Sequence, residues 1–240
     1  MLKQVTPYNS EQSKKSQVED MFDNIAPKYD LLNHVLSMKI DVLWRNKLVK
    51  WLKKDQPQTV LDVATGTGDL AIAVQKGTGA KVIGLDLSQQ MLNVGIEKIS
   101  KLNKSTQIEM VKGDAENLPF GDDHFDGVTV AFGVRNFENL EKGLSELLRV
   151  VKKERSVYIL EFSKVEGFLG PLYMFYFKNI LPLIGRMVSK DNRAYTYLPD
   201  SVNAFPYGEK LRKILLTVGF TRVEYTKVSM GIATIYKATK

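Results

Sequence analysis

The sequence predicts an α/β fold in which helices cover both faces of a mostly parallel β-sheet. Short β-rich runs alternate with helical segments from residue 59 onward, and the first run leads into a glycine-containing turn. Parallel strands need crossover connections, which are usually helices packed on the sheet faces. Two further β-rich runs close the chain and predict an antiparallel hairpin. The 240 residues suit a single domain of this class.

The expected sheet has seven strands, and its parallel part consists of five short runs rich in β-branched residues. These runs are residues 59–63, 81–86, 107–112, 126–131 and 157–162. Apolar residues at helical spacing predict helices at 70–76, 88–101 and 140–151, with Ser88 and Asn139 as N-caps. The runs 222–227 and 232–238 flank Met230-Gly231 and form the expected hairpin.

Two segments lie outside this alternating pattern, within one domain that spans 1–240. Residues 1–55 precede the first strand as an N-terminal helical cap, ahead of a cofactor-binding core at 56–163. Residues 164–207 follow the fifth strand as an insert, and 208–240 add a helix and the hairpin. The stretch 167–188 is strongly apolar, but its uncharged runs are shorter than the roughly 20 residues that span a bilayer. It predicts an apolar helical lid or a helix that lies on a membrane surface.

The composition excludes several kinds of site. The chain has no cysteine and two histidines, so disulfides, thiolate nucleophiles and a metal site are not expected. The net charge of +7 is compatible with nucleic acid, an anionic membrane surface or an acidic substrate. The basic residues are scattered in pairs, which is typical of a solvated surface, so no nucleic-acid partner is expected. No signal-peptide pattern is evident, which predicts a cytoplasmic protein.

A nucleotide-type ligand is expected at the turn after the first strand. Gly66 and Gly68, in the sequence ATGTGD, allow a tight turn and let a ligand approach the backbone without a Cβ in the way. Asp86 closes the second strand, where a carboxylate can accept hydrogen bonds from ribose hydroxyls. A nicotinamide dinucleotide would use the same residues, so this part of the pattern does not discriminate between the two cofactors.

The end of the third strand favours a positively charged adenosyl cofactor. Asp114 can accept a hydrogen bond from an adenine amino group, and Ala115 offers its backbone N–H to a ring nitrogen. The turn lacks the basic emphasis that a pyrophosphate requires, while Asp62 and Asp69 suit a sulfonium and an ammonium group. The sequence therefore predicts S-adenosylmethionine as cofactor, on the methyltransferase variant of the Rossmann plan.

Several separated motifs make the prediction more specific. They lie at residues 21–37 (MFDNIAPKYDLLNHVLS), 132–136 (FGVRN), 149–152 (RVVK), 161–163 (EFS) and 195–202 (YTYLPDSV). Together they resemble the ubiquinone/menaquinone biosynthesis C-methyltransferase family over nearly the whole chain. The resemblance implies a Rossmann-like class I S-adenosylmethionine-dependent methyltransferase fold, in which Thr67, Asp86, Asp114 and Ala115 match the family's cofactor contacts.

The resemblance also implies a substrate, the quinol ring of a polyprenylated quinone, with demethylmenaquinol as the expected acceptor. Arg135 and Asn136 are candidate catalytic residues that bind a substrate oxygen, and Tyr29 with Asp30 would close over the site from the cap. An isoprenoid tail would account for the apolar stretch 167–188. It predicts transient contact with the inner face of the cytoplasmic membrane, helped by the basic surface. A homodimer is among the partner states that the sequence leaves open.

Two departures from the family pattern bear on the substrate. Ala131 stands where enterobacterial-type members, which also make ubiquinone, carry serine, and Lys153-Glu154-Arg155 replaces a Pro-Gly-Gly turn. These departures favour demethylmenaquinol over a ubiquinone precursor, which stays the alternative together with other phenolic substrates. A nucleic-acid methyltransferase, a nicotinamide dehydrogenase and a non-catalytic quinone-binding protein are alternatives from other classes. Salt-dependent RNA binding would favour the first, and a nicotinamide titration would identify the second.

Overall fold

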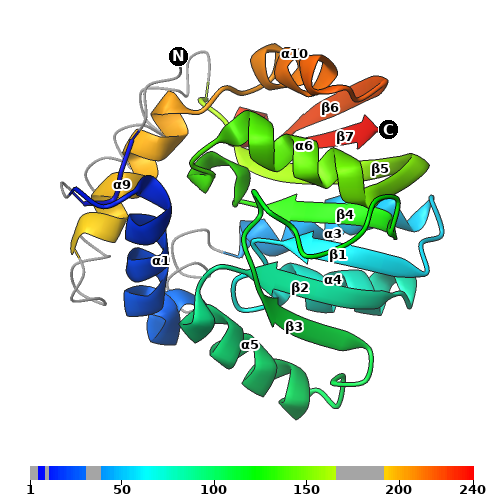
Figure 1. The fold of residues 1–240 in the computed structure, drawn as a ribbon, viewed down its shortest axis with the longest axis horizontal. Helices are drawn as coiled ribbons and strands as arrows, with labels where there is room; N and C mark the ends of the chain where they lie inside the picture. The colour runs from blue at the N-terminus through cyan, green and yellow to red at the C-terminus, as the bar shows by residue number, and fades with distance from the viewer. Residues whose placement is uncertain (1–4, 9–10, 31–38, 166–191) are drawn as a thin grey trace.

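β1 (Thr59–Val63) lies inside a seven-stranded sheet of order β3-β2-β1-β4-β5-β7-β6 in this computed structural model (Figure 1). The structure describes residues 5–8, 11–30, 39–165 and 192–240. The parallel strands are β1, β2 (Lys81–Asp86), β3 (Ile108–Lys112), β4 (Phe125–Ala131) and β5 (Val151–Phe162). β7 (Ala233–Thr239) runs antiparallel to β5 and to β6 (Arg222–Val228), which confirms the predicted hairpin.

The strand order reverses beside β1, and this reversal positions the site. The chain proceeds from β1 to β2 and β3 on one side, then crosses to β4 on the other side. Such a reversal leaves a crevice at the carboxyl ends of the two strands that flank it. A ligand site is therefore expected where Val63 of β1 and Ala131 of β4 end their strands.

β5 is longer than the sequence indicated. It begins at Val151, directly after α6 (Leu140–Val150), whereas its expected start was residue 157. The pairing with β4 shifts from Phe125↔Val151 to Gly127↔Ser156, so the extra residues of β5 form a bulge. Glu154 lies in this bulge with a φ of 61°, which is how the turn is made without glycine.

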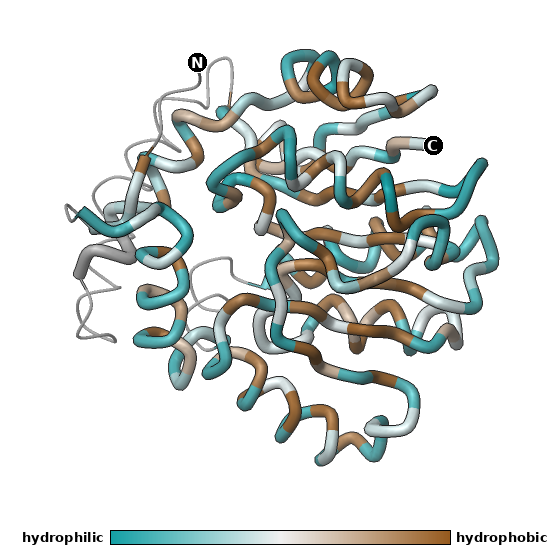
Figure 2. Tube along the Cα trace, in the orientation of Figure 1, coloured by the Kyte–Doolittle hydropathy of each residue, from teal (hydrophilic) through white to brown (hydrophobic). Residues whose placement is uncertain are grey.

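Helices cover both faces of the sheet, as predicted. α3 (Ile40–Lys53), α4 (Asp69–Thr78) and α5 (Gln89–Lys101) lie on one face, and α6 and α10 (Glu209–Val218) lie on the other. Alternation along β5 serves both layers, because Ile159 packs with the α6 side and Tyr158 with the α3 side. Hydrophobic residues follow the strands and the helix sides that face them (Figure 2).

Local capping residues set several helix ends as the sequence indicated. Ser88 Oγ accepts a hydrogen bond from the Met91 N–H at 3.1 Å, and Asn139 Oδ1 accepts one from the Lys142 N–H at 3.0 Å. Each side chain satisfies an N–H group that has no partner within its helix, so both predicted N-caps are confirmed.

Two helices lie beyond the carboxyl ends of the parallel strands (Figure 1). α1 (Lys14–Ile25), which continues into η1 (Ala26–Lys28), packs through Met21 against Met91 of α5 and Tyr197 of α9 (Asn192–Ala204). α3, expected as part of the same cap, packs on the sheet instead. The expected lid at 167–188 lies outside the described residues. None of the described helices is long and apolar enough to cross a bilayer.

Candidate active site

A pocket opens between α1 and the carboxyl ends of the parallel strands. Its empty volume is about 730 Å³, part of which is open to solvent. Its walls come from α1, the turn after β1, the ends of β2 and β3, and the turn after β4. Predicted site residues on these walls are Tyr29, Gly66, Asp86, Asp114, Ala115 and Asn136.

The turn after β1 brings main chain to the pocket wall. Gly66 has a φ of 57° and Gly68 a φ of 80°, which side chains rarely tolerate. A Cβ on Gly66 would lie 3.9 Å from Tyr29 Cε1, so Tyr29 faces the turn from the cap. The Gly66 N–H donates to Asp86 Oδ2 at 2.8 Å, which ties the turn to the end of β2.

Asp86 and Asp114 close neighbouring strands and both reach the pocket. Asp86 Oδ1 also accepts a hydrogen bond from the Ser88 N–H at 2.9 Å, and burial raises the pKa of the Asp86 carboxyl above its usual value. Asp114 Oδ1 accepts from the Glu116 N–H at 2.9 Å, and Asp114 Oδ2 accepts from Lys15 Nζ of α1 at 2.6 Å. Both carboxylates thus lie at the pocket, and Lys15, which sequence reasoning missed, pairs with Asp114 there.

Asp62 lies behind the pocket wall. It is buried, and its two carboxylate oxygens accept hydrogen bonds from Thr65 Oγ1 at 2.6 Å and Thr129 Oγ1 at 2.7 Å. Burial raises the pKa of Asp62 to about 6. Its hydrogen bond with Thr65 fixes the start of the glycine turn. Asp62 can therefore act on a ligand by shaping that turn and by its negative charge, but not by direct contact.

A second network lies behind the turn and joins it to the N-terminal segment. Lys98 Nζ of α5 lies 2.6 Å from Asp30 Oδ2, 2.8 Å from Asp69 Oδ1 and 3.1 Å from Thr67 Oγ1. Thr67 Oγ1 donates to Asp30 Oδ1 at 2.5 Å. Asp69 also pairs with Arg45 of α3 at 3.2 Å. Thr67 and Asp69, expected at the cofactor, therefore hold the shape of the turn from outside the pocket, and Gly68 lies behind the wall with them.

The turn after β4 carries the two candidate catalytic residues in η2 (Val134–Asn136). The Arg135 side chain is 8% exposed, and its Nη1 donates to Glu161 Oε1 at 2.8 Å and to the Phe132 carbonyl. Of the buried side-chain nitrogen and oxygen atoms in the described part of the chain, only Arg135 Nε has no hydrogen-bond partner. Glu161 is fully buried, and burial raises the pKa of its carboxyl. Arg135 thus lies beneath the site with its guanidinium largely shielded and its Nε–H without a hydrogen-bond partner.

Asn136, in contrast, reaches the pocket. Its Oδ1 accepts a hydrogen bond from the Tyr197 hydroxyl of α9 at 3.0 Å. Burial raises the pKa of Tyr197 to about 12, so its hydroxyl keeps its proton and remains a donor at neutral pH. The arrangement fixes the orientation of the Asn136 amide.

Lys14 of α1 holds η2 from the other side. Lys14 Nζ donates to the Arg135 carbonyl at 3.0 Å and the Phe137 carbonyl at 2.8 Å. Burial, followed by the charge of Arg135, lowers the pKa of Lys14 to about 8. Burial of a lysine destabilises the fold unless its N–H groups are hydrogen-bonded, and here they bind the turn that carries Asn136.

Sequence reasoning missed four residues at this site: Lys14, Lys15, Glu161 and Tyr197. Glu161 and Tyr197 lie within the motifs at 161–163 and 195–202, but their contacts with Arg135 and Asn136 were not predicted. Lys14 and Lys15 form one of several lysine pairs, and nothing local distinguishes them from solvated surface. Their partners lie 99 to 124 residues away in the sequence.

Comparison with known proteins agrees with this geometry. A demethylmenaquinone methyltransferase of Bacteroides fragilis is 47% identical over 238 residues, which cover 98% of this chain and 97% of the relative. A demethylmenaquinone methyltransferase of Porphyromonas gingivalis is 43% identical over 239 residues, covering 98% of each chain. These matches run through the cap, the core and the C-terminal hairpin alike.

Solved structures support the fold. A SAM-dependent methyltransferase of Thermotoga maritima superposes with a TM-score of 0.65 at 18% identity, covering 92% of this chain and 99% of that one. The predicted methyltransferase variant of the Rossmann plan is confirmed. The model of the ubiE/COQ5 methyltransferase family matches residues 10–240. The chain therefore belongs to the ubiE/COQ5 methyltransferase family.

Proposed function

We propose that this chain transfers the methyl group of S-adenosylmethionine to a ring carbon of demethylmenaquinol. The observation that carries the proposal is the meeting of Asp86 and Asp114 with Tyr29 and Asn136 in one pocket at the strand-order reversal. The first pair suits an adenosyl group and the second an aromatic acceptor. The names of relatives at 43–47% identity support this choice of acceptor.

The pocket walls fit the methyl donor. The Asp86 carboxylate keeps lone pairs for ribose hydroxyls beside the two N–H groups it already accepts. Asp114 accepts from the amino group of an adenine and the Ala115 N–H donates to a ring nitrogen, and Gly66 leaves the space that a Cβ would fill. Asp62 contributes negative charge from below the turn, which favours a cationic ligand.

S-adenosylmethionine supplies an electrophilic methyl group on a positively charged sulfur. The ring carbon becomes nucleophilic when the neighbouring quinol hydroxyl passes its proton to solvent water at the open side of the pocket. As the methyl group bonds to that carbon, S-adenosylhomocysteine leaves, and the ring proton then passes to water, which restores the aromatic ring. Asn136 orients that hydroxyl with an amide whose oxygen is already engaged by Tyr197. The largely shielded charge of Arg135 stabilises the developing oxyanion, and Glu161 holds the guanidinium in place. Tyr29 covers the turn and limits the entry of water.

The substrate is a membrane lipid, and the enzyme works as a peripheral protein on the inner face of the cytoplasmic membrane. The net charge of +7 supports this, because anionic lipids attract basic proteins. The family's quinol tail must remain in an apolar phase while its ring is in the pocket, so a transient contact suffices.

The test is transfer of a labelled methyl group to reduced demethylmenaquinone and to a demethylated ubiquinol precursor, side by side in detergent. We expect label on the naphthoquinol. Asn136→Ala should lower kcat by about 10²-fold, while Asn93→Ala, at an exposed asparagine of α5, should leave it unchanged. Label on the benzoquinol alone would move the assignment to the alternative substrate. Label on neither, with the donor still bound, would refute the proposed acceptor.

A further inference from the structure

Two exposed apolar side chains lie on neighbouring elements at the pocket edge of the sheet. Leu43 of α3 is 66% exposed and Met230 of η4 (Ser229–Gly231) is 75% exposed, the highest values among large hydrophobic residues of the described chain. Trp44 Nε1 donates to Ser229 Oγ at 2.8 Å, which joins the two elements. Single exposed hydrophobic residues are ordinary, but these two lie on elements that a hydrogen bond holds together.

The backbone of η4 presents Met230 outward. Ser229 and Met230 have φ values of 46° and 55°, a conformation that residues other than glycine rarely adopt, here in two consecutive positions. Met230 is not needed there for core packing, because it is mostly solvent-exposed. Such strain persists where the surroundings impose it and is frequent at functional surfaces.

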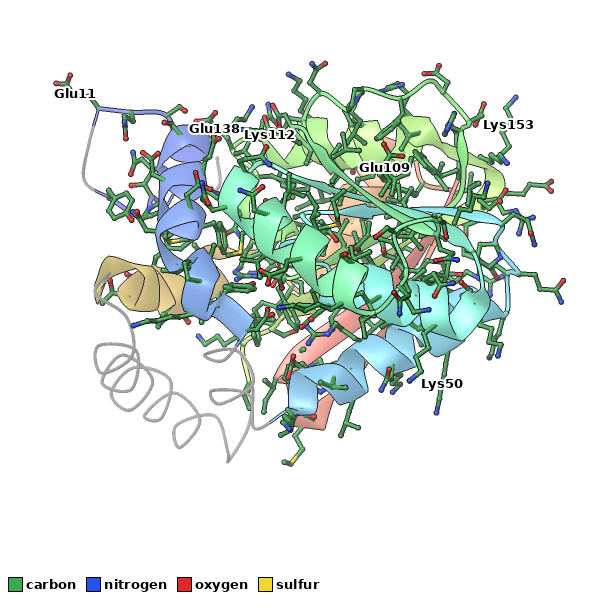
Figure 3. The ribbon with its side chains drawn as sticks, turned by 90° about the horizontal axis from the view of Figure 1, so that it is seen from below. Glu11, Lys50, Glu109, Lys112, Glu138 and Lys153 are labelled. Atoms are coloured by element: carbon green, nitrogen blue, oxygen red, sulfur yellow. The ribbon has the colours of Figure 1, made fainter. Side chains whose placement is uncertain are left out.

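Lysines flank Leu43 along the same side of α3. Leu43 and Lys47 are four residues apart and Lys50 lies three further on, so they form one stripe of the helix surface, and Lys39 is the N-cap residue that precedes the first turn. The three lysines are exposed, and Figure 3 shows Lys50 extending away from the molecule. The acidic residue of α3, Asp41, is buried and paired with Arg45. The stripe therefore carries positive charge without an exposed acid.

This surface is close to the reaction site through a layer of aromatic residues. The Trp44 ring lies 6.1 Å from that of Phe132 and 6.2 Å from that of Phe162. Phe132 lines the pocket, and Phe162 lies 5.5 Å from the Arg135 guanidinium. Only the aromatic layer of Trp44, Phe132 and Phe162 therefore separates the part of α3 that carries Leu43 from the pocket.

We propose that Lys39, Leu43, Lys47, Lys50 and Met230, the α3–η4 face, dock this enzyme on an anionic lipid surface. The inference rests on the proposed function, since a membrane-resident quinol is the reason for such docking. Leu43 and Met230 enter the boundary between headgroups and acyl chains, and the lysines pair with anionic headgroups. A basic stripe beside apolar anchors is the pattern of interfacial binding.

The experiment is co-sedimentation of the full chain with phosphatidylcholine vesicles, with and without phosphatidylglycerol. Replacing Lys39, Lys47 and Lys50 together by Gln should lower binding to the anionic vesicles by about 100-fold, since each lysine near such a surface contributes about fivefold and the three contributions multiply. The matched control replaces Lys81, Lys142 and Lys153, which are exposed elsewhere, by Gln and carries the same net charge. We expect the control to bind like the wild type.

The apolar anchors are tested in the same way. Leu43→Gln with Met230→Gln should lower binding, and Ile96→Gln with Leu102→Gln, at residues that are each 48% exposed, should not. Equal loss in the face and control variants would overturn the proposal, as would unchanged vesicle binding with a smaller mass in solution, which would assign the face to contact between copies of this chain. All variants should methylate a tail-free quinol in solution equally. Failure of the wild type in that assay would refute the proposed function and leave the vesicle result standing.

Discussion

Replacing Lys98 should loosen the hold of the N-terminal segment on the cofactor. Its ammonium has three acceptors at 2.6, 2.8 and 3.1 Å, which come from the segment after η1, from α4 and from the glycine turn. Lys98→Met removes all three contacts with little change in side-chain length. Asp30 then loses its cationic partner, and the adjacent Tyr29 is held less firmly over Gly66.

The magnitude follows from the burial of the pair. The side chains of Lys98 and Asp30 are 25% and 29% exposed, between a surface ion pair and a buried one. A surface pair contributes about 0 to 1 kcal/mol and a hydrogen bond to a charged group about 1.5 to 3 kcal/mol. We expect Lys98→Met to destabilise the position of the N-terminal segment over the glycine turn by about 1 to 2 kcal/mol. The dissociation rate of S-adenosylmethionine then rises by roughly 5- to 30-fold.

The assay is the dissociation rate of S-adenosylmethionine, measured by displacement with excess S-adenosylhomocysteine, together with its equilibrium affinity. Lys101→Met is the control, because Lys101 is on the same helix and pairs at 2.6 Å with Glu97 on an exposed surface. Asp30→Asn and the double variant complete a cycle that measures the coupling of the two positions. The role of the Lys98–Asp30 pair would be refuted by an unchanged dissociation rate in Lys98→Met. It would also be refuted if the effects of the two substitutions on that rate were additive.

Three further predictions concern residues that do not line the pocket. Lys14→Met should lower kcat by about tenfold and leave the affinity for S-adenosylmethionine unchanged, because the Arg135 carbonyl loses its hydrogen bond from Lys14. An equal loss of affinity for S-adenosylmethionine would contradict this positioning role. The pKa of Asp62 is raised to about 6 by burial, so the folded state binds the extra proton and wild-type stability falls as pH rises from about 4 to 6. Asp62→Asn should remove this pH dependence of the free energy of unfolding, measured by urea titration, and raise stability at pH 7 by about 1 to 3 kcal/mol. If the pH dependence persists in the variant, another group causes it. Asp126 accepts from Lys152 and three donors at the start of β1, and although burial opposes it, these hydrogen bonds lower the pKa of Asp126 to about 2. Asp126→Ala should cost about 2 to 4 kcal/mol at neutral pH, an effect that fades as pH falls below 4 toward 2, and a cost that persists there would exclude its charge as the cause.

The sheet and its helices could be predicted because their signals are local. Apolar runs and helical spacing recur along the chain, and Ser88 and Asn139 mark helix starts with their own side chains. The start of β5 could not be predicted, because the bulge at Glu154 depends on pairing with β4 and not on any turn residue. Propensity thus identified each element, while partner strands decided where β5 begins.

The acids at the strand ends illustrate the same division at the site. Asp62, Asp86 and Asp114 look equivalent in sequence, since each lies at or near the end of a parallel strand. In the structure Asp86 and Asp114 reach the pocket, whereas Asp62 is turned under the loop and engaged by two hydroxyls. The direction of each side chain depends on the path of the chain after its strand, which the residue type does not determine.

By itself, the sequence determined the fold class, the strand ends that carry the acids, the glycine turn and the family resemblance, because these depend on short-range patterns and on motifs. Only the tertiary structure decided which acids face the pocket, that Lys14 and Lys15 connect α1 to η2 and to Asp114, and that Arg135 lies paired with Glu161 beneath the site. It also brought Met230 beside α3 through the contact of Trp44 with Ser229. These contacts join residues far apart in the chain, and such pairs form only when the packed sheet brings its carboxyl edge and the covering helices together.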